Sequence, residues 1–191
     1  RRLTVRISAY VVQKLRRFSG CRAFTMTPPA KQWIIFRHGL ATHSKTGYGD
    51  RIVTAEVLPE GRPPIQRLGV YLKDKPFEYG VRSEFIRCQQ TAQIVTDATG
   101  HVFVPDSRLN EQVKENFEQV RARVAHFVQE TSALPYQHIW ICTHGIIIAA
   151  LKSLLIKGAF TPGDANDYTQ PGQLLIIQEQ TAEVIRFEQV V

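Results

Sequence analysis

The sequence predicts an α/β fold, a three-layer sandwich in which helices flank a mostly parallel central sheet. After residue 32, short apolar runs that are typical of buried strands alternate with segments of helical periodicity. Strands and helices that alternate along a chain build parallel sheets covered by helices on both faces. The 191 residues suffice for one domain with a full hydrophobic core. Because no repeat, low-complexity tract or linker interrupts them, we predict a single domain over residues 26–191.

The first half of this domain contains two predicted strands and two predicted helices. In chain order they are a strand at 33–37, a helix at 63–73, a strand at 77–83 and a helix at 84–99. Pro63-Pro64 favours the start of a helix, because proline lacks the N–H that the first turn leaves unpaired. Gly100 predicts the end of the second helix, since glycine readily adopts the left-handed backbone found there.

The second half continues the alternation. Its predicted elements are a strand at 101–104, a helix from about 117, a strand at 138–143, a helix at 145–157 and a hairpin of strands at 173–178 and 182–188. An apolar stripe at helical spacing defines the first of these helices: Phe117, Val120, Val124, Phe127 and Val128. The apolar run 146–156 contains Lys152 and is shorter than the ~18 residues of a membrane span. We therefore predict a buried helix there and no membrane partner.

The net charge of +7 comes from the N-terminus alone. Residues 1–25 contain seven basic residues and no acidic one, whereas the remainder has 17 of each sign. The folded part therefore has no charge bias towards nucleic acid, and we predict no such partner for it. We expect the natural chain to start at Met26, which makes the leader, residues 1–25, non-native or disordered. An organelle transit peptide is the first alternative and a basic arm for nucleic acid or anionic membrane the second. The predicted location is cytoplasmic, or organellar if the leader is a transit peptide.

Cysteines and histidines show no metal-binding spacing. Cys21, Cys88 and Cys142 are odd in number, and the last two fall on apolar segments, which predicts buried thiols in a reducing compartment. His38 and His144 lack the close spacing of zinc ligands, and no cluster of aspartates suggests magnesium. We predict neither a metal nor another cofactor.

Polar residues follow the predicted strands at one common edge of the sheet. Arg37-His38-Gly39 closes the first strand, Ser83 the second and His144 the fourth, while Glu111 lies on the loop after the third. Ligands of parallel α/β sheets bind beyond the carboxyl ends of the strands. We therefore expect these side chains to converge, together with Arg87 at the start of the following helix.

This set of residues suits phosphoryl transfer. His38 is the candidate nucleophile, because a neutral imidazole can attack phosphorus and form a phosphohistidine. The candidate phosphate-binding residues are Arg37, Arg87, His144 and Gly145. Arginine offers a planar fork to phosphate oxygens, and a charged histidine adds a further donor. Glu111 can protonate the departing oxygen and then activate water.

Four further residues are candidate substrate contacts: His43, Ser44, Ser83 and Glu84. We expect Ser83 mainly to cap the helix that starts at Glu84, with phosphate contact as its second role. His43 and Ser44 lie on the loop that follows the nucleophile.

At these positions the chain resembles the histidine phosphatase superfamily, also called the phosphoglycerate mutase-like family. The segments that carry the resemblance are Phe36-Arg37-His38-Gly39, Leu58-Pro59-Glu60-Gly61, residues 83–92, Leu109-Asn110-Glu111 and Cys142-Thr143-His144-Gly145. The resemblance implies a phosphoglycerate mutase-like fold, a phosphohistidine intermediate at His38, a phosphate pocket of Arg37, Arg87 and His144, and Glu111 as proton donor. Glu84 stands where the family motif has proline.

The resemblance also indicates which branch of chemistry to expect. Only five residues separate Glu111 from Phe117, where mutases place a long insertion over the substrate. An uncovered site excludes water poorly, which favours hydrolysis. We expect a metal-independent phosphatase that acts on phosphomonoesters or protein phosphohistidine, with a small phosphorylated substrate or a phosphoprotein as partner. The alternatives are a phosphoglycerate mutase-type transfer and a non-catalytic phosphate-binding module. The second alternative is supported by Leu40 and Ser44, which stand where many members of the family carry polar residues.

Overall fold

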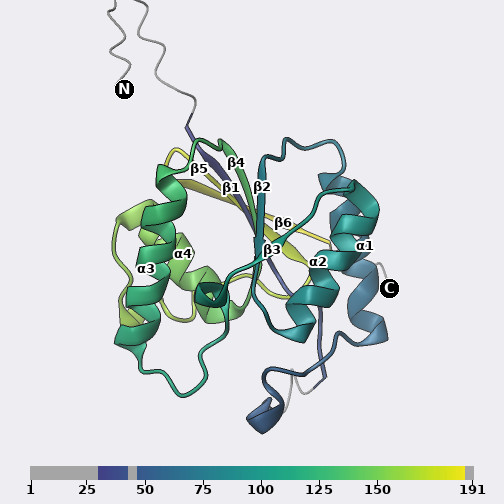
Figure 1. Ribbon diagram of the computed structural model, residues 1–191, viewed down its shortest axis with the longest axis horizontal. Coiled ribbons are helices and arrows are strands. Elements are labelled where there is room, and N and C mark those ends of the chain that lie inside the picture. Colours follow the sequence, from purple (N-terminus) through teal and green to yellow (C-terminus); the bar gives the residue numbers. More distant parts are fainter. Residues whose placement is uncertain (1–29, 43–46, 188–191) are drawn as a thin grey trace, which may run out of the picture.

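The computed structural model describes residues 30–42 and 47–187 (Figure 1). The leader, Cys21, His43 and Ser44 lie outside these residues. The strands are β1 (Gln32–Arg37), β2 (Tyr79–Arg82), β3 (Val104–Pro105), β4 (His138–Thr143), β5 (Gln173–Gln178) and β6 (Thr181–Arg186). The helices are α1 (Arg62–Leu72), α2 (Ile86–Thr99), α3 (Phe117–Ala133) and α4 (Gly145–Lys157), with short 3-10 turns between them. Over the described ranges, no helix has both the length and the hydropathy of a transmembrane span.

One sheet contains all six strands, in the order β3-β2-β4-β1-β5-β6. The first four strands in this order are parallel, and β5 and β6 add an antiparallel hairpin beside β1. In register, Arg37 of β1 lies opposite Thr143 of β4, and Arg82 of β2 lies opposite Cys142 of β4. The carboxyl ends of these three strands therefore meet at one edge, as the sequence predicts.

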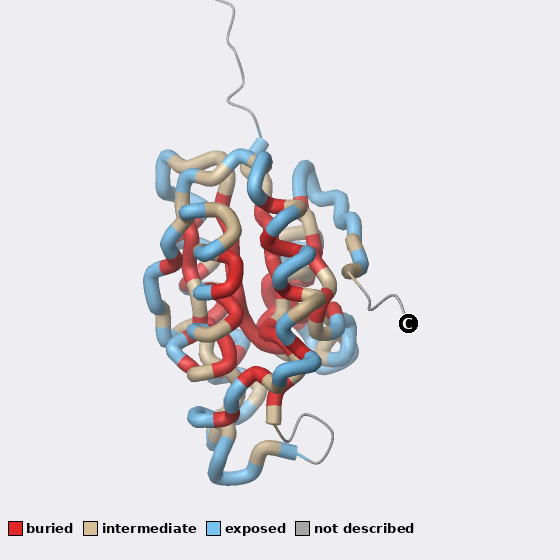
Figure 2. The backbone as a smooth tube through the Cα atoms, turned by 90° about the vertical axis from the view of Figure 1, so that its right-hand side faces the viewer, coloured by how far each residue is buried: buried red, intermediate tan, exposed pale blue. Residues whose placement is uncertain are grey.

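The sheet separates two hydrophobic cores, which confirms the predicted layers. Side chains alternate along a strand, so Ile35 packs with the buried faces of α3 and α4, whereas Phe36 packs with those of α1 and α2. Figure 1 shows the two helix pairs on opposite sides of the sheet, and Figure 2 shows buried residues where helices face it. Full burial of one such side chain contributes about 1.5–3 kcal/mol, so the two cores stabilise the sheet that carries this edge.

The chain between β2 and α2 differs from the prediction. β2 spans Tyr79–Arg82 instead of 77–83, and α2 begins at Ile86 instead of Glu84. The N–H of Phe85 donates to Ser83 Oγ at 3.2 Å, and the extended backbone of Phe85, with ψ of 144°, makes it the N-cap residue. The prediction that Ser83 caps this helix is therefore wrong, and its hydroxyl is available to the site.

The third strand is also shorter than predicted. It covers Val104–Pro105 instead of 101–104. The ring of His101 stacks on that of Phe77, with centroids 4.1 Å apart and 7° between the planes. The His101 ring also lies edge-on to that of Trp140 in β4, with centroids 5.3 Å apart, so residue 101 packs against the sheet without pairing in it. The predicted hairpin is confirmed, and Cys88 and Cys142 are buried free thiols.

Candidate active site

His38 directly follows β1 at the carboxyl edge. Its backbone N–H donates to the carbonyl of Thr143 at 3.1 Å, which continues the pairing of β1 and β4. Its Nδ1 lies 2.8 Å from the carbonyl oxygen of Gly39. Because a carbonyl oxygen only accepts, Nδ1 must carry the proton. The buried Nε2, which has no hydrogen-bond partner among the described residues, therefore holds the free lone pair.

Gly39 permits the close approach of the next loops. A Cβ at this position would lie 2.9 Å from the carbonyl oxygen of Gly61. The N–H of Gly39 donates to Oγ1 of Thr91 at 2.9 Å, and the same hydroxyl donates to the carbonyl of Arg87 at 2.7 Å. Thr91 thus fastens α2 to the loop that carries His38. The sequence alone does not indicate this role, although Thr91 lies in the segment 83–92 that resembles the family motif.

Arg87 is the first of two arginines beside the histidines. Its side chain is fully buried, its Nη1 donates to the carbonyl of Ile52, and its Cζ lies 4.4 Å from the ring centre of Tyr48. Its Nε and Nη2 have no partner among the described residues. Buried charged donors are costly unless an anion accepts from them. This guanidinium therefore fits the binding of an anion.

Arg37 approaches from the end of β1. Its Nη1 donates to Oε1 of Gln170 at 3.4 Å, and its Cζ lies 5.0 Å from the ring centre of Tyr168. Its Nε is buried and lacks a partner among the described residues. A Cβ on Gly145 would come within 3.2 Å of the Tyr168 ring, so this glycine admits the aromatic support of Arg37. Gln170 and Tyr168 carry no recognisable motif, and only the fold reveals them.

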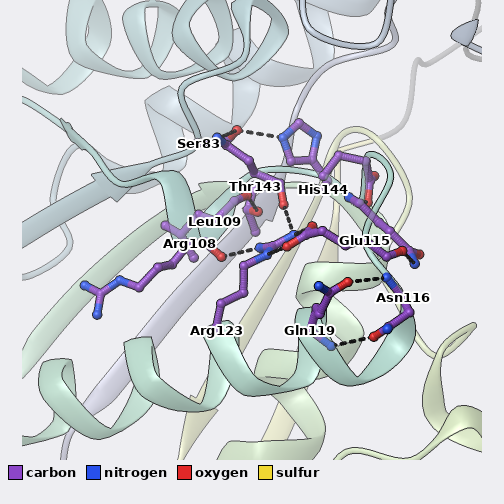
Figure 3. Close-up of polar contacts among 12 residues, drawn as sticks. Ser83, Arg108, Leu109, Glu115, Asn116, Gln119, Arg123, Thr143 and His144 are labelled. Atoms are coloured by element: carbon purple, nitrogen blue, oxygen red, sulfur yellow. Dashed lines mark hydrogen bonds and ion pairs between the residues drawn. The ribbon is translucent and has the colours of Figure 1, made fainter.

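His144 is the N-cap residue of α4, and its ring lies 5.2 Å from that of His38. Its Nε2 is 2.8 Å from Ser83 Oγ (Figure 3). Ser83 Oγ also lies 2.8 Å from Oδ1 of Asn110, whose Nδ2 donates to Glu84 at 2.9 Å. Since the hydroxyl proton points to Asn110 Oδ1, Nε2 of His144 must be the donor to Ser83. Nδ1 is then the unprotonated nitrogen of the neutral ring.

Glu111 projects from the loop between β3 and α3. Its carboxylate accepts the N–H of Gln112 at 3.1 Å. Arg123 of α3 holds this loop: it donates to the carbonyl of Arg108 at 2.5 Å and to that of Asn110 at 2.8 Å, and it pairs with Glu115 at 2.8 Å (Figure 3). The backbone on both sides of the glutamate is therefore fixed.

Burial and neighbouring charges set the protonation states. Burial, followed by the charges of Arg87 and Arg37, holds the pKa of His38 well below its usual range. Burial likewise lowers the pKa of His144, with His38 and the same two arginines adding to the effect. Burial raises the pKa of Glu111, although the Gln112 amide and the arginines oppose it. At neutral pH both imidazoles are therefore neutral, and the Glu111 carboxyl keeps its proton to a higher pH than an ordinary glutamate does.

The remaining candidate substrate contacts are Glu84, His43 and Ser44. Glu84 is exposed and contacts Asn110. His43 and Ser44 lie outside the described residues. Over the ranges 30–42 and 47–187, no three histidine, cysteine, aspartate or glutamate side chains cluster as metal ligands. The site thus gathers two arginines and two histidines; we call it the phosphate pocket (Arg37, His38, Arg87 and His144) after the ligand that the sequence predicts for it.

The fold and the pocket define an α/β protein whose sheet presents paired histidines and arginines at its carboxyl edge. The family model of the histidine phosphatase superfamily (branch 1) matches residues 33–113, which include His38, Arg87 and Glu111. Over these 81 of its 191 residues, the chain resembles this superfamily. No curated protein matches the sequence significantly.

Solved structures share the fold. The alpha-ribazole phosphatase from Shigella flexneri superposes with a TM-score of 0.69 at 19% identity, over 81% of this chain and 95% of that one. A mycobacterial glucosyl-3-phosphoglycerate phosphatase in complex with VO3 has a TM-score of 0.63 at 19% identity, covering 77% and 92%. The protein histidine phosphatase SixA in complex with tungstate has a TM-score of 0.55 at 17% identity, covering 81% and 94%.

Proposed function

We propose that this chain is a metal-independent phosphatase that hydrolyses phosphomonoesters, or phosphohistidine on a protein, through a covalent phosphohistidine on His38. One observation carries the proposal. The Nδ1 of His38 donates to its neighbour's carbonyl and leaves Nε2 free beside the unpaired donors of Arg87. A buried neutral imidazole next to cationic donors is suited to attack a bound phosphate.

In the first step, Nε2 of His38 attacks phosphorus and the bond from phosphorus to the leaving oxygen breaks. Arg37, Arg87 and His144 accommodate the charge on the equatorial oxygens. Glu111 transfers its proton to the leaving oxygen, so the alcohol departs neutral and the carboxylate remains. The raised pKa of Glu111 favours the protonated form that this step requires.

In the second step, water attacks the phosphohistidine. The carboxylate of Glu111 takes one proton from that water while the bond from phosphorus to Nε2 breaks. Inorganic phosphate and the neutral imidazole of His38 are released. Glu111 is protonated again and ready for another cycle.

The related structures support this reaction class. All three are phosphatases, and two of them are in complex with VO3 or tungstate. Both groups are oxyanions of a metal and stand in for a phosphoryl group. The phosphate pocket of this chain offers the charge and donors that such an anion needs.

A mutase-type transfer is less well supported. Only residues 112–116 separate Glu111 from the start of α3, so no long segment covers the site there. Water reaches an open phosphohistidine readily, which favours hydrolysis. A non-catalytic phosphate-binding module would not need Glu111 with a raised pKa.

The test is a His38→Ala variant, assayed on an alkyl and an aryl phosphate in the presence of a chelator. We expect wild type to remain active and the variant to lose nearly all turnover, because no other group can form the intermediate. Acid-quenched wild type should carry acid-labile phosphate that the variant lacks. His126→Ala, an exposed histidine on α3, serves as the matched control. Equal turnover in wild type and His38→Ala would refute the mechanism, and loss of activity on chelation would refute metal independence.

A further inference from the structure

An open groove of about 490 Å³ adjoins Glu111. Its walls come from two loops that are distant in sequence, with Val53 on one side and Val113 and Lys114 on the other. Phe85 also lines it, and the ring of Phe85 lies 5.3 Å from that of His144. The groove therefore lies next to the phosphate pocket and passes the side chain of the candidate acid.

Hydrogen bonds hold both walls of the groove in place. The N–H of Ile86 donates to the carbonyl of Val53 at 3.1 Å, and Arg87 donates to the carbonyl of Ile52. On the opposite side, Arg123 fixes the loop that carries Glu111. The groove is thus preformed, and a ligand need not order it.

Of the two cations that line the groove, one is paired with a carboxylate and the other is not. Arg123 is paired with Glu115 at 2.8 Å, so these two charges compensate each other. Lys114 is exposed, and within the described part of the chain its ammonium has no ionic or hydrogen-bonding partner. Its backbone has a φ of 54°, a left-handed conformation that is uncommon for lysine and places it at a tight turn. Val53, Phe85 and Val113 therefore form an apolar part of the groove beside one uncompensated positive charge, and Ser107 and Asn110 add polar lining.

We propose that this groove binds the alcohol part of the substrate and selects small phosphomonoesters whose alcohol has an apolar body and a second, anionic group. This inference rests on the proposed function. Glu111 protonates the leaving oxygen, so the alcohol must begin beside Glu111 and extend into the groove. Val53, Phe85 and Val113 then contact its body, and Lys114 attracts its distal anion.

The experiment uses three benzyl esters that differ only far from the reacting bond, together with one polar alkyl ester. Wild type is assayed with benzyl phosphate, 4-carboxybenzyl phosphate, 4-(aminomethyl)benzyl phosphate and glycerol 1-phosphate. We expect benzyl phosphate to exceed glycerol phosphate in kcat/KM by about tenfold, because part of the ring is buried against apolar walls. The carboxylate should add about a further two- to fivefold, as exposed ion pairs do, and the ammonium should lower the value. Both effects should appear mainly in KM.

Variants separate the two contacts. Lys114→Asn tolerates the left-handed backbone and should abolish the carboxylate preference, whereas Lys114→Glu should invert it in favour of the ammonium. Val53→Ser with Val113→Ser should reduce the advantage of benzyl over glycerol phosphate. Lys73→Asn, an exposed lysine that follows α1, is the control for net charge and should change nothing. Circular dichroism of each variant checks that it folds.

The experiment distinguishes failure of the groove assignment from failure of the proposed function. Hydrolysis of all four esters with similar kcat/KM, unaltered by the Lys114 variants, would overturn the groove assignment and leave the phosphatase intact. Faster hydrolysis of a phosphohistidine protein than of every small ester would also overturn it. If no ester were hydrolysed and no phosphate appeared on His38, the proposed function would fall, and this inference with it.

Discussion

Two histidines of similar burial are given different protonation patterns by their neighbours. The carbonyl of Gly39 fixes the proton of His38 on Nδ1, whereas the proton of His144 lies on Nε2, which donates a hydrogen bond to Ser83 Oγ. The first arrangement leaves the outer nitrogen free for attack. The second leaves a ring that can gain a proton on Nδ1 when phosphate brings negative charge. The sequence predicts both histidines, but their tautomers depend on carbonyl and hydroxyl directions that only the fold sets.

The assignment of Glu111 as general acid makes a prediction at the residue scale. Glu111→Gln should lower the rate for an alkyl phosphate by about 10²–10⁴-fold, because its leaving oxygen needs a proton. An aryl phosphate with a nitrophenolate leaving group should lose far less. For the alkyl ester, the basic limb of the pH–rate profile should flatten, since the group that must be protonated is gone.

Equal loss with both esters would assign Glu111 another role. Glu84 would then be the next candidate for the general acid. It stands where the family motif has proline, which could not act as an acid. Its exposed carboxylate accepts from Asn110, which links it to Ser83 and His144. Glu84→Gln assayed on the same two esters would decide between the carboxylates.

The loop between β3 and α3 depends on contacts from two elements. Thr143 of β4 donates to the carbonyl of Leu109 at 2.7 Å, and Arg123 of α3 binds the carbonyls of Arg108 and Asn110. A short loop with so many anchors holds Glu111 without an additional cap. The site is open because this loop is short, whereas the loop is held in place by the hydrogen bonds from Thr143 and Arg123.

Arg123→Met should therefore impair catalysis through Glu111 although Arg123 is not assigned to the chemistry. The variant keeps an unbranched side chain but loses the bonds to two carbonyls and to Glu115. We expect the alkyl phosphate rate to fall at least tenfold and the aryl rate to change little. Arg121→Met removes an exposed pair with Glu118 on the same helix and should have no effect. A uniform fall for both esters would indicate general destabilisation, which urea unfolding would reveal.

Elements with strong periodicity were predictable from the sequence, whereas contacts across the sheet were not. β4 and α4 have the predicted bounds, because one is an apolar run and the other ends at Gly158 with φ of 72°. The boundaries near β2 and β3 shift because Phe77 stacks on His101, a pairing between residues 24 positions apart. Thr91 and Arg123 were missed for the same reason: their partners lie on other elements.

At the scale of the whole molecule, the site places two neutral imidazoles and two arginines inside a folded sheet edge. His38 and His144 are both buried, and their lowered pKa values mean that the folded state resists their protonation. In the unfolded chain, histidine titrates with a pKa of about 6.5. The two states therefore bind different numbers of protons in mildly acidic solution.

This difference predicts how stability depends on pH. Below about pH 6.5 the unfolded chain takes up protons on His38 and His144 that the folded state refuses, so stability falls as the pH drops. Each histidine contributes a slope of up to about 1.4 kcal/mol per pH unit. Glu111 acts in the opposite sense, because its raised pKa lets the folded state gain a proton before the unfolded state does. Two histidines outweigh one carboxyl, so a net loss of about 1–2 kcal/mol is expected between pH 6.5 and 5.5.

Urea unfolding of two proteins at pH 7.5 and 5.5 measures this effect. The comparison is wild type against the double variant His38→Asn, His144→Gln. Asparagine can reproduce the Nδ1 donor of His38 and glutamine the Nε2 donor of His144, but neither titrates. Other groups contribute equally to both proteins, so the difference in slope isolates the two histidines. The variant should lose less stability on acidification, and an equal loss would show that the buried imidazoles already bind protons in the folded state.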